Sequence, residues 1–246
     1  MDSKLDTILF DLDGTLLQIP LDSFINAYMN KLQKVFTALD MDAAECIKAV
    51  WVGTGAMVDN DGSMRNDERF WKVFIKELSL SEKQCRVVEA ACNEFYVNEF
   101  DTIKSIMPPN EISGRLIRTL QTKGYEVVLA TNPLLPSCAV TTRLRWLGLE
   151  QEDFALVTHY SNSTFCKPNL KYYEEVFTKI NQAPEQCLMV GNDIVEDMVA
   201  GELGAKTYLV TDCLENKAGL DIAAFRHGTL SELEEYLGSF PEIKAR

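Results

Sequence analysis

Two aspartates lie close together where an apolar segment ends, in the run Ile8-Leu9-Phe10-Asp11-Leu12-Asp13-Gly14-Thr15. Side chains alternate along an extended strand, so Asp11 and Asp13 are expected to point the same way while Leu12 faces the core. Two carboxylates at the mouth of a strand can share a divalent cation, while one attacks a substrate and the other moves a proton. The pattern indicates an enzyme.

Other polar groups with chemical potential follow three further apolar segments. They are Thr131-Asn132-Pro133 after residues 126–130, Lys167-Pro168 beyond residues 154–157, and Gly191-Asn192-Asp193 with Asp197 after residues 187–190. In open parallel sheets, ligands bind beyond the carboxyl ends of the strands. We therefore expect a hydroxyl–amide pair, a cation and a second acidic cluster to meet Asp11 and Asp13 at one edge of the sheet. Residues 131–133 are also compatible with the start of a helix, with Asn132 as its cap.

The charges of this predicted site require a cation. Asp11, Asp13, Asp193 and Asp197 against Lys167 leave a formal charge of −3. Two like charges about 4 Å apart repel by about 4 kcal/mol at an effective dielectric constant of about 20. Such a site repels an anionic substrate unless a divalent cation is bound, and Mg²⁺ prefers oxygen ligands of this kind.

The composition limits the class of protein. The chain has 246 residues and a formal net charge of −13, with 46% hydrophobic and 25% charged residues. An acidic chain disfavours nucleic acid and anionic membrane as partners, because both are bound by basic patches. Seven cysteines without a C-x-x-C pair favour reduced thiols and a cytoplasmic location. The N-terminal residues show no secretion signal, and no segment approaches the length of a membrane-spanning helix.

Short apolar runs alternate with helical patterns through the second half of the chain. The runs are residues 7–10, 126–130, 154–157, 187–190 and 207–210. The helical patterns are residues 111–123, 137–147 and 194–203, each followed by a glycine in the terminating position, at 124, 148 and 204. This order predicts an α/β fold, a Rossmann-like buried parallel sheet with helices on both faces.

A helical insertion separates the first strand from the rest of this pattern. Phe24, Tyr28, Leu32, Val35 and Leu39 recur at helical spacing. We expect a catalytic core formed by residues 1–17 and 108–246, and an α-helical cap domain formed by residues 18–107. Within the cap, residues 51–55 (Trp-Val-Gly-Thr-Gly) are a candidate specificity loop or an interhelical turn, and residues 59–62 are an expected turn between helices.

The four motifs together resemble those of the haloacid dehalogenase superfamily, in the branch with a helical cap after the first motif, as in phosphoglycolate-phosphatase-like enzymes. The matching motifs are D-L-D-G-T at residues 11–15, A-T-N at 130–132, Lys167-Pro168, and G-N-D-x-x-x-D at 191–197. They occur in the family's order, and the resemblance spans nearly the whole chain.

The resemblance implies a role for each motif residue. Asp11 would be the nucleophile that takes the phosphoryl group, and Asp13 the acid and then the base. Thr131 and Asn132 would donate hydrogen bonds to the phosphate, and Lys167 would neutralise charge on the nucleophile and the phosphate. The acidic cluster would complete the Mg²⁺ site, because positioning and charge neutralisation are most of what phosphoryl transfer needs.

One position departs from the family pattern. The family usually has an acid directly after the glycine of the fourth motif, where this chain has Asn192 followed by Asp193. Because Mg²⁺ prefers carboxylates, we predict that Asp11, Asp13 and Asp193 ligate the metal. Asn192 is an alternative ligand through its amide oxygen, and Asp197 is expected to lie behind the metal ligands or to bind the metal through a water.

The function expected from these residues is a Mg²⁺-dependent phosphatase that acts on a small phosphorylated metabolite through an aspartyl-phosphate. A phosphomutase or phosphotransferase of the same superfamily is the nearest alternative. A 2-haloacid dehalogenase is disfavoured, because a halide leaving group needs no acid and those enzymes lack the second Asp. A phosphorylated receiver-like switch is disfavoured by the length of the chain and by its cap.

Overall fold

One parallel sheet carries the core of the protein. In the computed structural model, which describes residues 5–108 and 110–243, six strands pair in the order β3-β2-β1-β4-β5-β6. All pairings are parallel. The strands are β1 (Thr7–Phe10), β2 (Glu126–Leu129), β3 (Leu156–Val157), β4 (Cys187–Gly191), β5 (Lys206–Val210) and β6 (His227–Gly228). The central strand β1 is the one that leads into Asp11.

The predicted sheet is confirmed, with two differences. The third strand is only Leu156–Val157, because Phe154 belongs to the segment before it. The sixth strand was not predicted, because two residues beside β5 are too short to show an apolar pattern.

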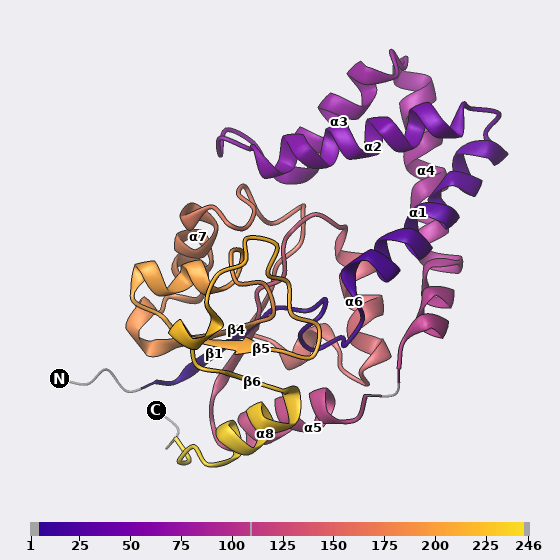
Figure 1. Ribbon diagram of the computed structural model, residues 1–246. Helices are drawn as coiled ribbons and strands as arrows, with labels where there is room; N and C mark the ends of the chain where they lie inside the picture. Colours follow the sequence, from indigo (N-terminus) through magenta and orange to yellow (C-terminus); the bar gives the residue numbers. More distant parts are fainter. Residues whose placement is uncertain (1–4, 109, 244–246) are drawn as a thin grey trace.

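Helices cover both faces of the sheet (Figure 1). The alternate strand residues Ile8 and Phe10 pack with α5 (Ile112–Thr122), α6 (Ser137–Trp146) and α8 (Leu230–Gly238). Leu9, on the opposite face, packs with α7 (Leu170–Ile180). The remaining short helices of the core are η2 (Gln151–Asp153), η3 (Pro184–Gln186), η4 (Met198–Leu203) and η5 (Ile222–Ala224). The expected burial of the sheet between two helical layers is confirmed.

The helix predicted over residues 194–203 is wrong in type and in start. The structure has only the 3-10 helix η4 from Met198. Asp193 Oδ1 accepts the backbone N–H groups of Val195 and Glu196 at 2.7 and 2.9 Å, so the chain first makes a tight turn. The three predicted terminating glycines do adopt positive φ, +86° at Gly124, +69° at Gly148 and +100° at Gly204.

Between β1 and α5 the chain forms a helical insertion, defined here as residues 21–106. It contains α1 (Leu21–Ala38), α2 (Ala43–Val58), α3 (Asn66–Glu77), α4 (Glu82–Asn98) and η1 (Phe100–Ile106). Residues 51–55 lie inside α2, so they are neither a loop nor a turn. Residues 59–62 join α2 to α3, as expected. In Figure 1, α2 and α3 overhang the carboxyl ends of the strands.

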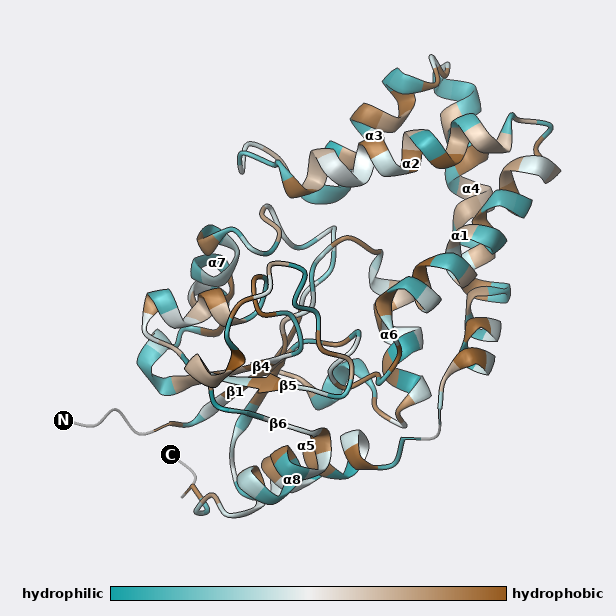
Figure 2. Cartoon of the chain, viewed as in Figure 1, coloured by the Kyte–Doolittle hydropathy of each residue, from teal (hydrophilic) through white to brown (hydrophobic). Residues whose placement is uncertain are grey.

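An aromatic cluster joins the helical insertion to the core. The Phe100 ring stacks on Trp146 of α6, with 5.9 Å between ring centroids, and also contacts Phe24 and Tyr28 of α1. Figure 2 shows hydrophobic residues along the facing sides of these helices. The contact buries large rings on both partners, so it fixes α1 beside the edge of the sheet.

A second junction lies at the start of α3. The amide nitrogen of the buried Asn66 lies 3.4 Å from the carbonyl oxygens of Pro133 and Phe165, and its backbone N–H donates to Ser163 O at 2.9 Å. Asn60 donates to Asn66 Oδ1 at 2.8 Å, which holds the junction from the side of the insertion. None of the helices within residues 5–108 and 110–243 has the length and apolar character needed to cross a membrane.

Candidate functional site

The nucleophile candidate lies at the end of the central strand. Asp11 directly follows β1, and its backbone N–H donates to Val190 O of β4 at 2.9 Å. The side chain is buried, with 8% of the residue exposed. Thr131, two residues after β2, and Asn192, directly after β4, also line the cavity that contains Asp11. The structure therefore brings three of the four predicted motifs together through the strand order alone.

Lys167 bridges two acids at the bottom of this site. Its Nζ lies 2.9 Å from Asp11 Oδ1 and 2.7 Å from Asp197 Oδ1. The Lys167 side chain is fully buried, and so are both of its hydrogen bonds. A buried ammonium that is shared by two carboxylates is held in one position, beside Asp11.

Burial shifts the pKa values of Asp11, Asp197 and Lys167. It raises the pKa of Asp11 to about 7, although the positive charge of Lys167 opposes the shift. Burial likewise raises the pKa of Asp197. Burial alone would lower the pKa of Lys167, but the two carboxylates outweigh it and hold that pKa well above its usual range. Lys167 is therefore charged at neutral pH, and Asp11 loses its proton at a higher pH than an ordinary carboxyl does.

Thr15 and Asn192 complete the wall beside Asp11. The Thr15 hydroxyl lies 2.9 Å from Asn192 Oδ1 and 3.3 Å from Asp11 Oδ2, while Asn192 Nδ2 donates to Cys213 O at 2.7 Å. Gly14 has a φ of +82°, and a Cβ there would lie 2.3 Å from the Asn192 amide. Only glycine permits this approach, which brings Asn192 against the first motif.

Asp13 is paired with an arginine that the sequence analysis did not single out. Arg143 of α6 is 1% exposed and forms an ion pair and a hydrogen bond with Asp13 Oδ2. Its Nε donates to Ala139 O at 3.2 Å, and its guanidinium lies 5.3 Å from the centre of the Phe24 ring. Asp13 Oδ1 is buried and has no hydrogen-bond partner among the described residues. Arg143 thus fixes one carboxylate oxygen of Asp13 and leaves the other to a ligand.

Thr131 and Asn132 line the same cavity. The Thr131 carbonyl accepts hydrogen bonds from Thr158 and Tyr172, which fixes the backbone at this point. Asn132 Nδ2 donates to Glu196 at 3.0 Å, and within the described chain Asn132 Oδ1 is buried without a partner. Burial raises the pKa of Glu196 to about 7. Helix α6 begins only at Ser137, so residues 131–133 do not start a helix.

Asp193 and Asp197 differ in burial and in the hydrogen bonds that they make. Asp197 is 1% exposed, and besides Lys167 it accepts the backbone N–H of Asp193 at 2.9 Å. A Cβ on Gly191 would lie 2.1 Å from the Asp197 carboxylate, so glycine lets Asp197 fold over the end of β4. Asp193 is only partly buried, and one of its oxygens holds the turn before η4.

The donor set for a metal is smaller than four carboxylates. In the part of the chain that the structure describes, no group of three or more His, Cys, Asp or Glu side chains could hold a metal ion. A carboxylate oxygen, Asp11 Oδ2, and an amide oxygen, Asn192 Oδ1, both lie within hydrogen-bonding distance of the Thr15 hydroxyl. Mg²⁺ is held by one or two carboxylates and keeps several waters, so this donor set fits it.

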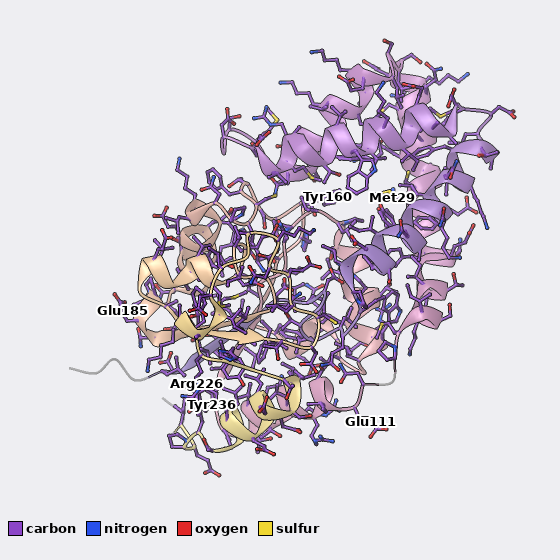
Figure 3. The ribbon with its side chains drawn as sticks, viewed as in Figure 1. Met29, Glu111, Tyr160, Glu185, Arg226 and Tyr236 are labelled. Carbon is purple, nitrogen blue, oxygen red and sulfur yellow. The ribbon has the colours of Figure 1, made fainter. Side chains whose placement is uncertain are left out.

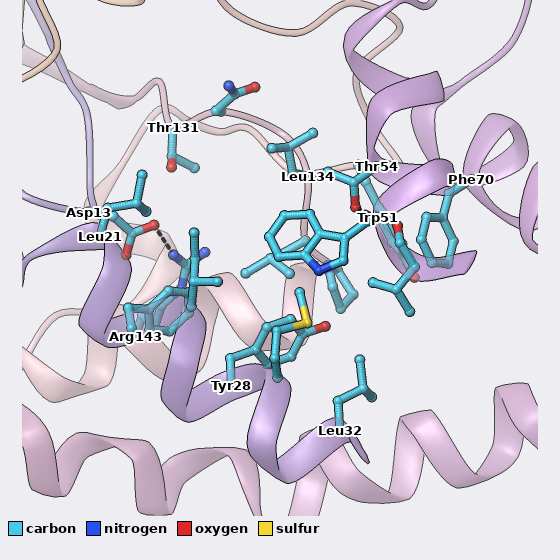
Figure 4. A pocket seen from close by; sticks show the side chains of 18 of the residues that line it. Asp13, Leu21, Tyr28, Leu32, Trp51, Thr54, Phe70, Thr131, Leu134 and Arg143 are labelled. Carbon is cyan, nitrogen blue, oxygen red and sulfur yellow. Dashed lines mark hydrogen bonds and ion pairs between the residues drawn. The ribbon is translucent and has the colours of Figure 1, made fainter. Parts of the chain in front are cut away.

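A cavity of about 240 Å³ opens above these groups, between the core and the helical insertion. Figure 4 shows Asp13, Thr131 and Arg143 at one end and Tyr28, Trp51 and Phe70 toward the other. The chemistry and the insertion therefore face one space.

Comparison with known proteins identifies the family. The family model described as haloacid dehalogenase-like hydrolase matches residues 5–204.

The chain belongs to the haloacid dehalogenase-like hydrolase family.

Individual relatives of this hydrolase are distant. It is 25% identical to pyrophosphatase PpaX of Bacillus cereus (strain Q1) over 219 residues, which cover 89% of this chain and 88% of that protein. A 2-haloacid dehalogenase from Pseudomonas syringae pv. Tomato DC3000 has a similar structure, with a TM-score of 0.66, 16% identity, and coverage of 95% of this chain and 98% of that one. A protein described as a predicted phosphoglycolate phosphatase from Haemophilus somnus 129PT gives a TM-score of 0.58 at 19% identity, covering 94% and 97%. These two structural likenesses show the fold.

Arg143 is the residue of this hydrolase that sequence reasoning missed. A signal was present, because Arg143 falls on the same face of its helix as the buried Ala139, Val140 and Leu144. A charged residue on an apolar helical face needs a buried partner. The partner, Asp13, lies 130 positions earlier in the chain, so the pattern could flag Arg143 without revealing its role.

Proposed function

We propose that this hydrolase is a Mg²⁺-dependent phosphatase, which hydrolyses a small phosphomonoester through an aspartyl-phosphate on Asp11. The observation that carries the proposal is the pairing of two acids with two different buried cations. Lys167 holds Asp11, and Arg143 holds Asp13. The names of PpaX as a pyrophosphatase and of the Haemophilus somnus protein as a phosphoglycolate phosphatase agree with phosphoryl chemistry.

In the first step, an Asp11 carboxylate oxygen attacks phosphorus and the ester P–O bond breaks. Asp13, in its acid form, gives its proton to the leaving oxygen. Arg143 fixes one Asp13 oxygen, so the proton is carried on the other, Oδ1, which has no partner among residues 5–108 and 110–243. Lys167 offsets the negative charge of Asp11 as the phosphoryl group approaches.

In the second step, the Asp13 carboxylate takes a proton from water as that water attacks phosphorus. The bond to Asp11 breaks, phosphate leaves, and Asp13 is again protonated. Thr131 and Asn132 are proposed to donate hydrogen bonds to the transferred group, Asn132 by exchanging its bond with Glu196. The helical insertion is proposed to act as a cap domain, residues 18–107, on a core of residues 1–17 and 108–246.

Mg²⁺, when bound, supplies positive charge against the phosphate oxygens. Asp11 would hold it together with Asn192, whose amide oxygen shares the Thr15 hydroxyl with Asp11. Asp193 and Asp13 remain predicted ligands, with Asp197 behind them. The seven cysteines form no disulfide, which supports the proposed cytoplasmic location.

A panel of phosphorylated metabolites, assayed with Mg²⁺ and with EDTA, tests this function. We expect phosphate release with Mg²⁺ only, none from Asp11→Asn, and normal release from the control Asp59→Asn, whose residue is exposed at the end of α2. Mass spectrometry of the quenched reaction is expected to find a phosphoryl adduct on Asp11. Turnover in EDTA, or by Asp11→Asn, contradicts the proposal. A bisphosphorylated product would indicate a phosphomutase instead.

A further inference from the structure

The side of the cavity that faces Asp11 and Asp13 carries no charge. All of the cavity-lining residues that the helical insertion contributes are apolar, aromatic or uncharged, among them Phe24, Leu32, Trp51 and Phe70. In the view of Figure 4 the indole of Trp51 extends between Leu134 and Tyr28. Figure 3 shows Met29 of α1 and Tyr160 of the core on two sides of the same space.

The hydroxyl groups on this wall are already hydrogen-bonded within the helical insertion. The hydroxyls of Tyr28 and Tyr96 lie 2.6 Å apart, and the Thr54 hydroxyl donates to Val50 O at 2.9 Å. A sugar or polyol in the cavity would lose its hydrogen bonds to water and gain few in return, which is costly for each buried hydroxyl.

The only positive charge among the residues that line the cavity is that of Arg143, and Asp13 engages it. Acids of the core line the cavity as well, including Glu196 and Glu215. A second phosphate or a carboxylate on the leaving group would therefore be buried without a counter-charge, facing like charges. Pyrophosphate and phosphoglycolate both carry such a second anionic group.

We propose that the group esterified to phosphate in the substrate is uncharged and apolar, an aromatic ring or a branched alkyl chain. This inference rests on the proposed phosphatase function and specifies its substrate class. The size of this group follows from the volume of the cavity, because a void of about 150 Å³ binds benzene. A cavity of about 240 Å³ holds one ring with a few further carbons.

A series of n-alkyl phosphates from ethyl to hexyl tests the apolar wall, since the leaving-group chemistry is nearly constant. Each methylene that enters the cavity is expected to raise kcat/KM about fourfold. Hexyl phosphate is then at least about 100-fold better than ethyl phosphate, and better than phosphoglycolate or pyrophosphate by a similar factor.

Two variants of Trp51 sharpen the test. Trp51 is 46% exposed on α2, so its replacement leaves the buried core of the insertion intact. Trp51→Ala is expected to lower kcat/KM for hexyl phosphate about tenfold and that for ethyl phosphate by a much smaller factor. Trp51→Arg is expected to improve phosphoglycolate relative to hexyl phosphate. Val97→Ala, on the outer surface of α4 with 75% exposure, is the matched control.

Binding of n-alkylphosphonates, measured by titration calorimetry, separates this inference from the function on which it rests. If affinity rises with chain length but no phosphate ester is hydrolysed, the phosphatase proposal fails and the apolar site stands. If esters are hydrolysed with no dependence on chain length, or if phosphoglycolate or pyrophosphate is preferred, the phosphatase stands and the apolar substrate class is wrong.

Discussion

Removal of Lys167 tests the electrostatic account of the site most directly. Lys167→Met keeps most of the side-chain volume and deletes a fully buried ammonium that bonds Asp11 and Asp197. The two carboxylates are then left together in a buried site without their cation. We expect a large loss of stability that grows with pH, besides the loss of activity.

The distances give the size of the effect. At 2.9 and 2.7 Å, each Lys167 ion pair is worth about 6 kcal/mol at an effective dielectric constant of about 20. The cost of burying the ammonium, which the variant no longer has, offsets much of this sum. Removal of one partner from a buried pair costs about 3–5 kcal/mol in practice, and we expect that range for Lys167→Met at pH 8.

The pH dependence follows from the raised pKa of Asp11. Burial raises this pKa from 3.8 to about 7, so between these values the folded protein binds more protons than the unfolded chain. Stability therefore falls as pH rises through this window. Without Lys167 the folded pKa moves higher still, and the fall extends beyond pH 7. The deficit of Lys167→Met is thus expected to be about 1 kcal/mol smaller at pH 6 than at pH 8.

Urea unfolding in EDTA at pH 6, 7 and 8 measures both quantities. Lys206→Met, at an exposed position of β5, is the control and should change little. The double variant Lys167→Met/Asp11→Asn should recover part of the stability and lose part of the pH dependence, because one buried carboxylate is gone. An equal deficit at pH 6 and pH 8, or a double variant no better than the single, would refute the reasoning.

Three further predictions concern neighbouring contacts. Arg143→Leu leaves Asp13 without its buried cation and should cost about 3 kcal/mol in urea unfolding. Asn192→Ala should weaken Mg²⁺ binding at least about tenfold in calorimetry, and more than Asp193→Asn does; the opposite order would favour the ligand predicted from sequence. Asn66→Ala removes the buried link between the helical insertion and the core and should cost about 1–3 kcal/mol in thermal unfolding, whereas an unchanged Tm would show that the link is not needed.

The sheet and the four motifs could be predicted because each depends on residues that are adjacent in the sequence. A buried parallel strand is a short apolar run, and its ligand-binding residues come directly after it, as Asp11 follows Phe10 and Asn192 follows Gly191. Because β1 and β4 pair in parallel, their carboxyl ends lie at the same edge of the sheet. Lys167 alone lies far from its strand, and its family motif, more than its spacing, made it predictable.

The wall of the cavity was not predictable in the same way. Residues 51–55 looked like a loop because of Gly53 and Gly55, yet they are helical. Gly53 is needed because a Cβ there would lie 2.8 Å from the ring of Phe70, so α2 and α3 pack closely at this point. That close contact joins two consecutive helices, and it is the packing of helices, not local pattern, that directs Trp51 toward the site.

One property, burial, links the nucleophile to the proposed selectivity. Burial is the largest cause of the raised pKa of Asp11, and the cavity that contains this carboxyl is lined by the uncharged residues of the helical insertion. The ion pair with Lys167, at 2.9 Å, does not return the pKa of Asp11 to its usual value, since that pKa stays near 7. A second cation beside Asp11 would favour its ionised form, which is the form proposed to attack phosphorus. We therefore expect the proposed phosphatase to need bound metal to keep Asp11 charged in a site that excludes charge from the leaving group.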